Sequence, residues 1–124
     1  MKHSEKEIRV WNRALGTGPI RLIGDLALSE LLRLHGYIKN GGVLHGVEGF
    51  GSDDWEFALE GYRLFGLGDI ADFLIDAKKR FQTTEDTGAL ESEANEHYYA
   101  SVTNERLLGA LRARLVSHPE DFDP

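Results

Sequence analysis

Acidic side chains are the residues of this chain whose types and spacing most directly suggest a chemistry. One group lies within residues 53–60, and a second, within residues 85–96, contains no basic residue. A carboxylate acts as a general acid or base where a cleft shifts its pKa, and no sequence pattern here identifies such a cleft. The other role is electrostatic, because exposed carboxylates steer a basic partner. The candidate partner-binding residues are Asp53, Asp54, Glu56, Glu60, Glu85, Asp86, Glu91, Glu93 and Glu96.

Histidines form the second candidate set, because histidine is a common metal ligand. Glu93 and His97 have the spacing that shares one helix face, but a single pair lacks the further ligands of a metal site. His35 and His45 flank a glycine-rich stretch, and His35 lies on an apolar stripe, which is typical of a buried, hydrogen-bonded histidine. A small-ligand or metal-dependent enzyme that uses the glycine loop, His35 and His45 stays open as an alternative function.

Helical periodicity is the pattern that must position these residues. Apolar side chains recur at helical spacing in most of the chain, and no segment alternates at period two for long enough to predict a sheet. We expect a single compact all-α domain of five or six helices over residues 1–124. The expected helix N-caps are Ser4, Ser52, Asp69 and Thr103.

The segment between the second and third expected helices is rich in glycine. Asn40, Gly41 and Gly42 form the structural motif that should end the helix before it, because Asn and Gly tolerate a left-handed backbone. Residues 43–51 contain three more glycines and should form a loop by propensity.

Composition restricts the classes of function. The chain of 124 residues has 21 acidic and 14 basic residues, a net charge of −7, and no cysteine. This charge argues against direct binding to nucleic acid. No segment approaches the roughly 20 apolar residues of a membrane span, and no signal peptide is evident, so we expect a cytoplasmic protein. We also expect no cofactor.

The first acidic group has a lower density of negative charge than DNA. On a helix, Asp53, Glu56 and Glu60 share one face, with Asp54 beside it. A helix rises about 10.5 Å between residues 53 and 60, a length over which duplex DNA carries about six charges. These four carboxylates are too few to match the charge of duplex DNA over this length. Imitation of a DNA backbone would therefore require the second acidic group alongside the first, or a dimer of the chain.

Three stretches together resemble a known family. They are IKNGGV at residues 38–43, the predicted helical hairpin at residues 58–81, and residues 94–122 with their Tyr-Tyr pair. Over about residues 28–122 the chain resembles the all-helical bacterial domain of unknown function 4375, whose named member is a DNA-mimic protein. Residues 43–46 depart from the family, which usually has Phe and then aromatic or amide residues there. The matching positions are Asn40, Gly41, Gly42, Tyr98, Tyr99, Pro119 and Phe122.

The resemblance implies an acidic protein that binds a transcription factor as a dimer, but it assigns no individual acidic residue. Together with the charge pattern, it favours a non-enzymatic binding protein, or DNA mimic, that occupies a basic surface of a DNA-binding regulator or nuclease. An immunity protein that neutralises a toxin domain fits the same features. Because exposed ion pairs contribute little affinity, we expect Trp55 or Tyr98 to supply apolar contacts.

Overall fold

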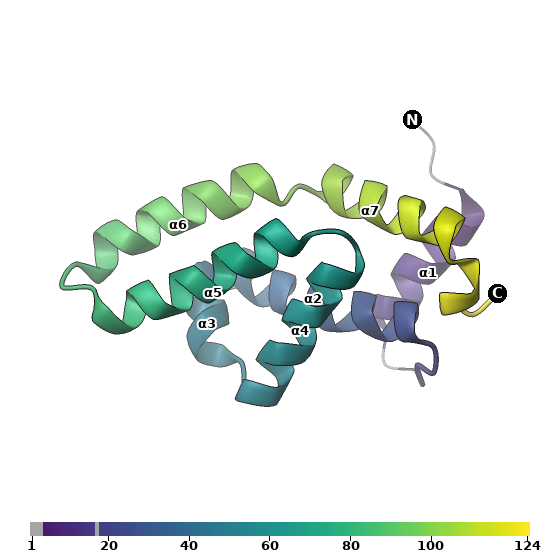
Figure 1. Cartoon of the computed structure of the whole chain (residues 1–124), viewed down its shortest axis with the longest axis horizontal. Helices are drawn as coiled ribbons and strands as arrows, with labels where there is room; N and C mark the ends of the chain where they lie inside the picture. The colour runs from purple at the N-terminus through teal and green to yellow at the C-terminus, as the bar shows by residue number, and fades with distance from the viewer. Residues whose placement is uncertain (1–3, 17) are drawn as a thin grey trace.

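Seven α-helices and one 3-10 turn make up the computed structural model, which describes residues 4–16 and 18–124 (Figure 1). No strand occurs in these residues, so the predicted all-α class is confirmed. The predicted number of five or six helices is too low, because the expected loop after residue 42 contains a helix. The elements are α1 (Glu5–Leu15), α2 (Ile23–Gly41), α3 (Val43–Gly49), α4 (Ser52–Leu64), α5 (Gly68–Thr83), α6 (Thr87–Ser101), α7 (Asn104–Ser117) and η1 (Pro119–Asp121).

Side-chain caps begin some of these helices where the sequence predicted them. The Ser4 hydroxyl accepts from the Glu7 amide at 3.1 Å, and the Thr103 hydroxyl accepts from the Arg106 amide at 3.1 Å. The other two predicted caps are wrong. Backbone conformation places the N-cap of α4 at Gly51 and that of α5 at Leu67, so Ser52 and Asp69 already lie inside their helices.

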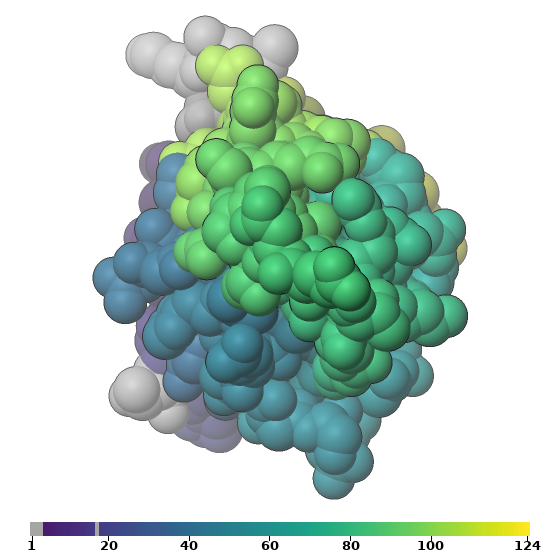
Figure 2. Space-filling view, turned by 90° about the vertical axis from the view of Figure 1, so that its left-hand side faces the viewer, coloured from purple at the N-terminus to yellow at the C-terminus, as the bar shows by residue number. Residues whose placement is uncertain are grey.

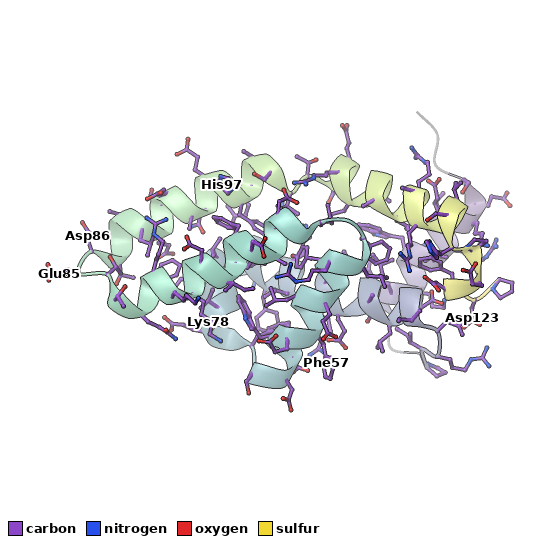
Figure 3. All side chains as sticks on the ribbon, in the orientation of Figure 1. Phe57, Lys78, Glu85, Asp86, His97 and Asp123 are labelled. Carbon is purple, nitrogen blue, oxygen red and sulfur yellow. The ribbon has the colours of Figure 1, made fainter. Side chains whose placement is uncertain are left out.

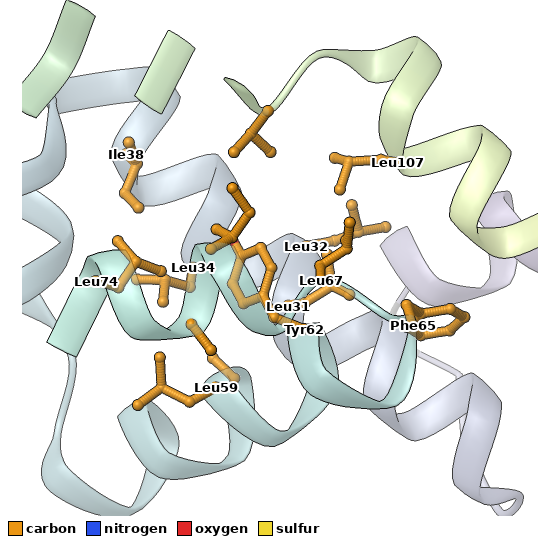
Figure 4. Close-up of a cluster of buried hydrophobic side chains, with 14 of the residues drawn as sticks. Leu31, Leu32, Leu34, Ile38, Leu59, Tyr62, Phe65, Leu67, Leu74 and Leu107 are labelled. Atoms are coloured by element: carbon orange, nitrogen blue, oxygen red, sulfur yellow. The ribbon is translucent and has the colours of Figure 1, made fainter. Parts of the chain in front are cut away.

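Helix α2 lies at the centre of the fold, since α1, α3 and α4 all pack against it. Helix α5 packs against α3, α4 and α6, and α7 packs against α1. Figure 4 shows the core between α2, α4 and α5, where Leu34, Tyr62 and Leu74 meet with no exposed surface. Among the described residues, no helix combines the length and apolarity needed to cross a membrane.

A partly buried ion pair joins the two ends of the described chain through α2. Asp25, in the first turn of α2, is 1% exposed. One of its carboxylate oxygens accepts from Arg13 of α1 at 2.7 Å, and the other accepts from the backbone amide of Asp123 at 2.8 Å. Arg13 also donates to the Asp123 carbonyl at 3.0 Å. We call this arrangement of Arg13, Asp25 and Asp123 the terminal clasp.

Candidate functional site: an acidic helix face beside an apolar groove

The outward face of α4 carries the first acidic group. Asp53, Glu56 and Glu60 are all exposed, and none of them forms an ion pair or side-chain hydrogen bond within the described chain. Asp54 lies 3.8 Å from the Arg33 guanidinium of α2. The structure therefore confirms that three carboxylates share a solvent-facing side of α4. It leaves their negative charge without a cationic partner.

An apolar groove of about 250 Å³ runs along the same side of the molecule, between α2 and α4. Three of its large side chains are about half exposed: Ile23 at 59%, Leu26 at 49% and Phe57 at 54%. Phe57 projects outward from α4 in Figure 3. Glu30 and Glu60 also line the groove, so carboxylates border its apolar surface. The remaining lining residues are Ala27, Gly61 and Leu64.

Two small residues bring α2 and α4 together at the groove. A Cβ atom on Gly61 would lie 2.5 Å from the Ala27 carbonyl oxygen, so only glycine permits this approach. Arg33, one to two turns further along α2, meets Asp54, which precedes Gly61 on α4. The two helices are therefore antiparallel. Their larger side chains stand on either side of this close contact.

The second acidic group lies on the turn between α5 and α6 and on α6 itself. Figure 3 places Glu85 and Asp86 at one end of the molecule, away from Phe57, and Figure 2 looks onto that end. Asp86 caps α6 by accepting from the Ala89 amide at 3.0 Å, and Glu93 pairs with Arg80 of α5 at 3.3 Å. The other members, Glu91 and Glu96, lie along α6, half-buried and exposed respectively.

Helix α5 separates the two acidic groups, because it packs against both α4 and α6 (Figure 1). Its last turns carry Lys78, Lys79 and Arg80. The Lys78 ammonium lies 4.9 Å from the centroid of the Trp55 ring of α4. The carboxylates of α4 and α6 therefore lie on two helices that α5 separates, with Lys78 beside α4 and Arg80 beside α6.

The Asn40-Gly41-Gly42 motif is a helix junction. Helix α2 continues to Gly41, and Gly42 has a φ of 92°, a left-handed value that favours glycine. The amide of Val43 then donates to the Asn95 side chain of α6 at 2.8 Å, so a distant residue caps α3. The predicted end of α2 is confirmed, and the motif turns the chain between two packed helices.

The predicted loop over residues 43–51 is wrong for a physical reason. A Cβ atom on Gly46 would lie 2.6 Å from the Ile38 side chain and 3.1 Å from that of Leu34. Glycine at this position lets α3 pack directly on α2. The packing outweighs the low helix propensity of glycine, which is worth about 1 kcal/mol.

The histidines of the alternative enzyme hypothesis do not face a common site. His35 is 7% exposed, and its Nδ1 lies 2.8 Å from the Tyr98 hydroxyl. That hydroxyl lies 2.7 Å from the Tyr62 hydroxyl, so the three side chains form a buried network. His45 is exposed and stacks on Tyr37, with ring centroids 5.4 Å apart. The described residues contain no group of three or more potential metal ligands.

Burial controls the ionisation of this network, which consists of His35, Tyr62 and Tyr98. Desolvation, with a smaller contribution from the positive charge of Lys39, lowers the pKa of His35 to about 4. Desolvation also raises the pKa of Tyr62 and of Tyr98 well above the usual value for a phenol. All three side chains are therefore neutral near pH 7, and His35 Nδ1 and the two hydroxyls all have hydrogen-bond partners.

The aromatic residues expected at an interface are in the core. Trp55 is 3% exposed and Tyr98 has no exposed surface, so neither reaches a partner. Of the two adjacent tyrosines, Tyr98 is the core residue and Tyr99 remains 40% exposed. The sequence analysis did not identify Phe57 as a candidate site residue. It could have been found, because Phe57 lies off the apolar stripe of α4 and between Glu56 and Glu60 in the sequence.

In comparisons with protein-family models, curated proteins and solved structures, nothing matched this chain. The resemblance to the DNA-mimic family therefore stays a prediction from the sequence.

Proposed function

We propose that this chain is a non-enzymatic acidic binding protein, and that the outward face of α4 occupies a basic surface of a partner protein. The observation that carries the proposal is the combination of unpaired charge and exposed apolar surface on one side of the molecule. Asp53, Glu56 and Glu60 have no cationic partner in the described chain, and Phe57 lies exposed among them. Electrostatic attraction would speed association, and the aromatic ring would contribute to affinity.

The proposal places the partner on α4 rather than across both acidic groups. Duplex DNA carries one negative charge per about 1.7 Å without interruption. The two acidic groups of this chain are separated by helix α5, which places Lys78 beside α4 and Arg80 beside α6. Imitation of DNA by a single copy of the chain would therefore rest on the α4 face alone, which is sparser than a DNA backbone. A dimer would be needed to extend the acidic surface.

Three classes of basic protein suit the α4 face: a DNA-binding regulator, a nuclease, or a toxin domain neutralised by an immunity protein. Each would need a basic surface of its own, and the identity of the captured protein would distinguish them. Exposed ion pairs contribute about 0–1 kcal/mol each, so the carboxylates would set the rate and salt dependence more than the affinity.

The test is capture of the partner from the native cell lysate at low salt, followed by a salt gradient and mass spectrometry. The bait is the unmodified protein. A second bait carries Asp53→Asn, Glu56→Gln and Glu60→Gln. A matched control bait neutralises three acids of the second group instead, with Glu85→Gln, Glu91→Gln and Glu96→Gln. These changes remove equal charge from the two faces.

We expect a basic protein that is retained by the unmodified bait and by the control bait. The bait with the three changes on α4 should lose it. Its elution should move to lower salt when the charge of α4 is reduced. Equal retention by the α4 bait would contradict the proposal, and so would elution that does not depend on salt.

A further inference from the structure

Building on the proposed function, we propose that the groove between α2 and α4 binds a basic amphipathic α-helix of the partner. The helix would insert large apolar side chains between Leu26 and Phe57 and place Lys or Arg residues against the carboxylates beside the groove. This inference specifies the structure of the partner surface, whereas the proposed function requires only that the surface is basic.

The dimensions of the groove match one face of a short helix. Its lining residues on α2 run from Ile23 to Glu30, and those on α4 run from Phe57 to Leu64. Seven residues of helix rise about 10.5 Å, so the groove offers about two turns of contact. Over two turns an amphipathic helix presents apolar residues at positions i, i+3, i+4 and i+7, the usual anchors of a helix in a groove.

The charge around the groove selects a basic helix. Glu30 and Glu60 line it, and Asp53 and Asp54 lie at the start of α4, near the end formed by Phe57. Arg33 of α2 contacts both Glu30 and Asp54, so Glu60 and Asp53 are the carboxylates of this group that have no cationic partner within the described residues. A partner helix with Lys or Arg flanking its apolar stripe would therefore meet complementary charge on the α4 side of the groove, where Glu60 is exposed and unpaired in the described chain.

Other occupants fit these observations less well. Small-molecule pockets commonly have volumes of about 300–1,000 Å³, whereas this open groove has about 250 Å³. A second copy of the chain related by a two-fold axis would bring the same carboxylates together, because each copy presents the same patch. An anionic membrane surface would be repelled by Glu60 and by the other exposed carboxylates of α4. An added strand would need a free sheet edge, and the described chain has no sheet.

The test measures fluorescence anisotropy of three labelled peptides at low salt. The first is a helical peptide of about five turns with leucines on one face and lysines flanking them. The second has the same composition in an order without an apolar stripe, and the third is the first peptide with a central proline. Each is titrated with the unmodified protein and with Phe57→Ser and Leu26→Ser. The matched control is Ile8→Ser, because Ile8 and Leu26 are both 49% exposed and Ile8 lies on α1.

We expect the amphipathic peptide to bind more tightly than either control peptide. Phe57→Ser and Leu26→Ser should each weaken this binding by about tenfold or more, and Ile8→Ser should leave it unchanged. All three changes replace exposed side chains, and thermal unfolding of each variant checks that its fold is retained.

Two results would overturn the helix proposal and leave the proposed function standing. One is equal, salt-sensitive binding of the amphipathic and reordered peptides that Phe57→Ser does not change. The other is a dimer of the chain that Phe57→Ser dissociates, since a second copy would then occupy the groove. Absence of binding by all peptides also overturns the helix proposal, and lysate capture decides the proposed function separately.

Discussion

Acidification should destabilise this protein through His35, because burial of its side chain, with a smaller effect of the Lys39 charge, keeps the imidazole in its neutral form. The pKa of His35 is lowered from 6.5 to about 4 in the folded protein. Each pKa unit corresponds to about 1.36 kcal/mol, so full acidification through this range costs about 3 kcal/mol of stability. Against a total of about 5–15 kcal/mol for a domain, this is a large loss.

The direction follows from proton binding in the two states. Well above pH 6.5 the imidazole is neutral in both states and contributes no pH dependence. As the pH falls below 6.5, the unfolded chain binds a proton that the folded protein excludes, and the free energy of unfolding decreases. The loss continues until the pH reaches about 4, where the folded protein also binds the proton. Between about pH 7 and about pH 5, His35 should cost about 2 kcal/mol.

Urea unfolding followed by circular dichroism, at about pH 7 and about pH 5, measures this effect. The unmodified protein is compared with His35→Gln, in which the pH-dependent loss should be smaller by about 2 kcal/mol. His97→Gln is the matched control, because it makes the same exchange at an exposed ring of α6. If His35→Gln and the unmodified protein lose the same stability on acidification, the assignment of a neutral, desolvated His35 is refuted.

Three further predictions concern stability, measured by urea unfolding near neutral pH. Tyr98→Phe removes the hydroxyl that joins the buried network and leaves two buried polar groups unpaired; we expect a loss of roughly 2–4 kcal/mol, and a loss below that of a single hydrogen bond would argue against the network. Gly61→Ala should destabilise by roughly 1–3 kcal/mol because its Cβ would meet the Ala27 carbonyl at 2.5 Å, whereas Gly109→Ala, with no atom within 4 Å, should stabilise by roughly 0.5–1 kcal/mol. Equal effects of the two glycine changes would contradict the close contact of α2 and α4. Asn95→Ala should cost about 1 kcal/mol by leaving the first amide of α3 uncapped, and an unchanged stability would show that the cap is dispensable.

The local rules of helix formation explain most of what the sequence predicted. The caps at Ser4 and Thr103 follow from hydrogen bonds within three residues, and the buried side of α5 follows from apolar spacing. Such features depend on residues that are close in the chain. They can therefore be predicted without knowledge of how the helices pack.

Tertiary contacts account for the features that the sequence did not predict. Helix α3 depends on the fit of Gly46 against Ile38 and on a cap from Asn95 in α6. Asn95 lies 52 residues after Val43, whose backbone amide donates to its side chain. Propensity measures neither contribution, so it assigned a loop to this segment.

The candidate site shows the same division between local and distant contacts. The exposed face of α4 could be predicted, because Asp53, Glu56 and Glu60 lie opposite its apolar stripe. The groove beside Phe57 could not, since it exists only where α2 and α4 meet at Gly61. The separation of the two acidic groups likewise depends on the position of α5.

The terminal clasp has a consequence for the order of events during protein synthesis. Asp25 is made early, but the backbone amide that satisfies its second carboxylate oxygen belongs to Asp123. Until residue 123 has been added, the start of α2 lacks this partner and the aromatic ring of Phe122, which packs against Gly24. Contacts between residues so far apart in sequence slow folding, because the long connection must be ordered before they can form. The growing chain should therefore complete its α1–α2 region only after residues 122 and 123 have been added.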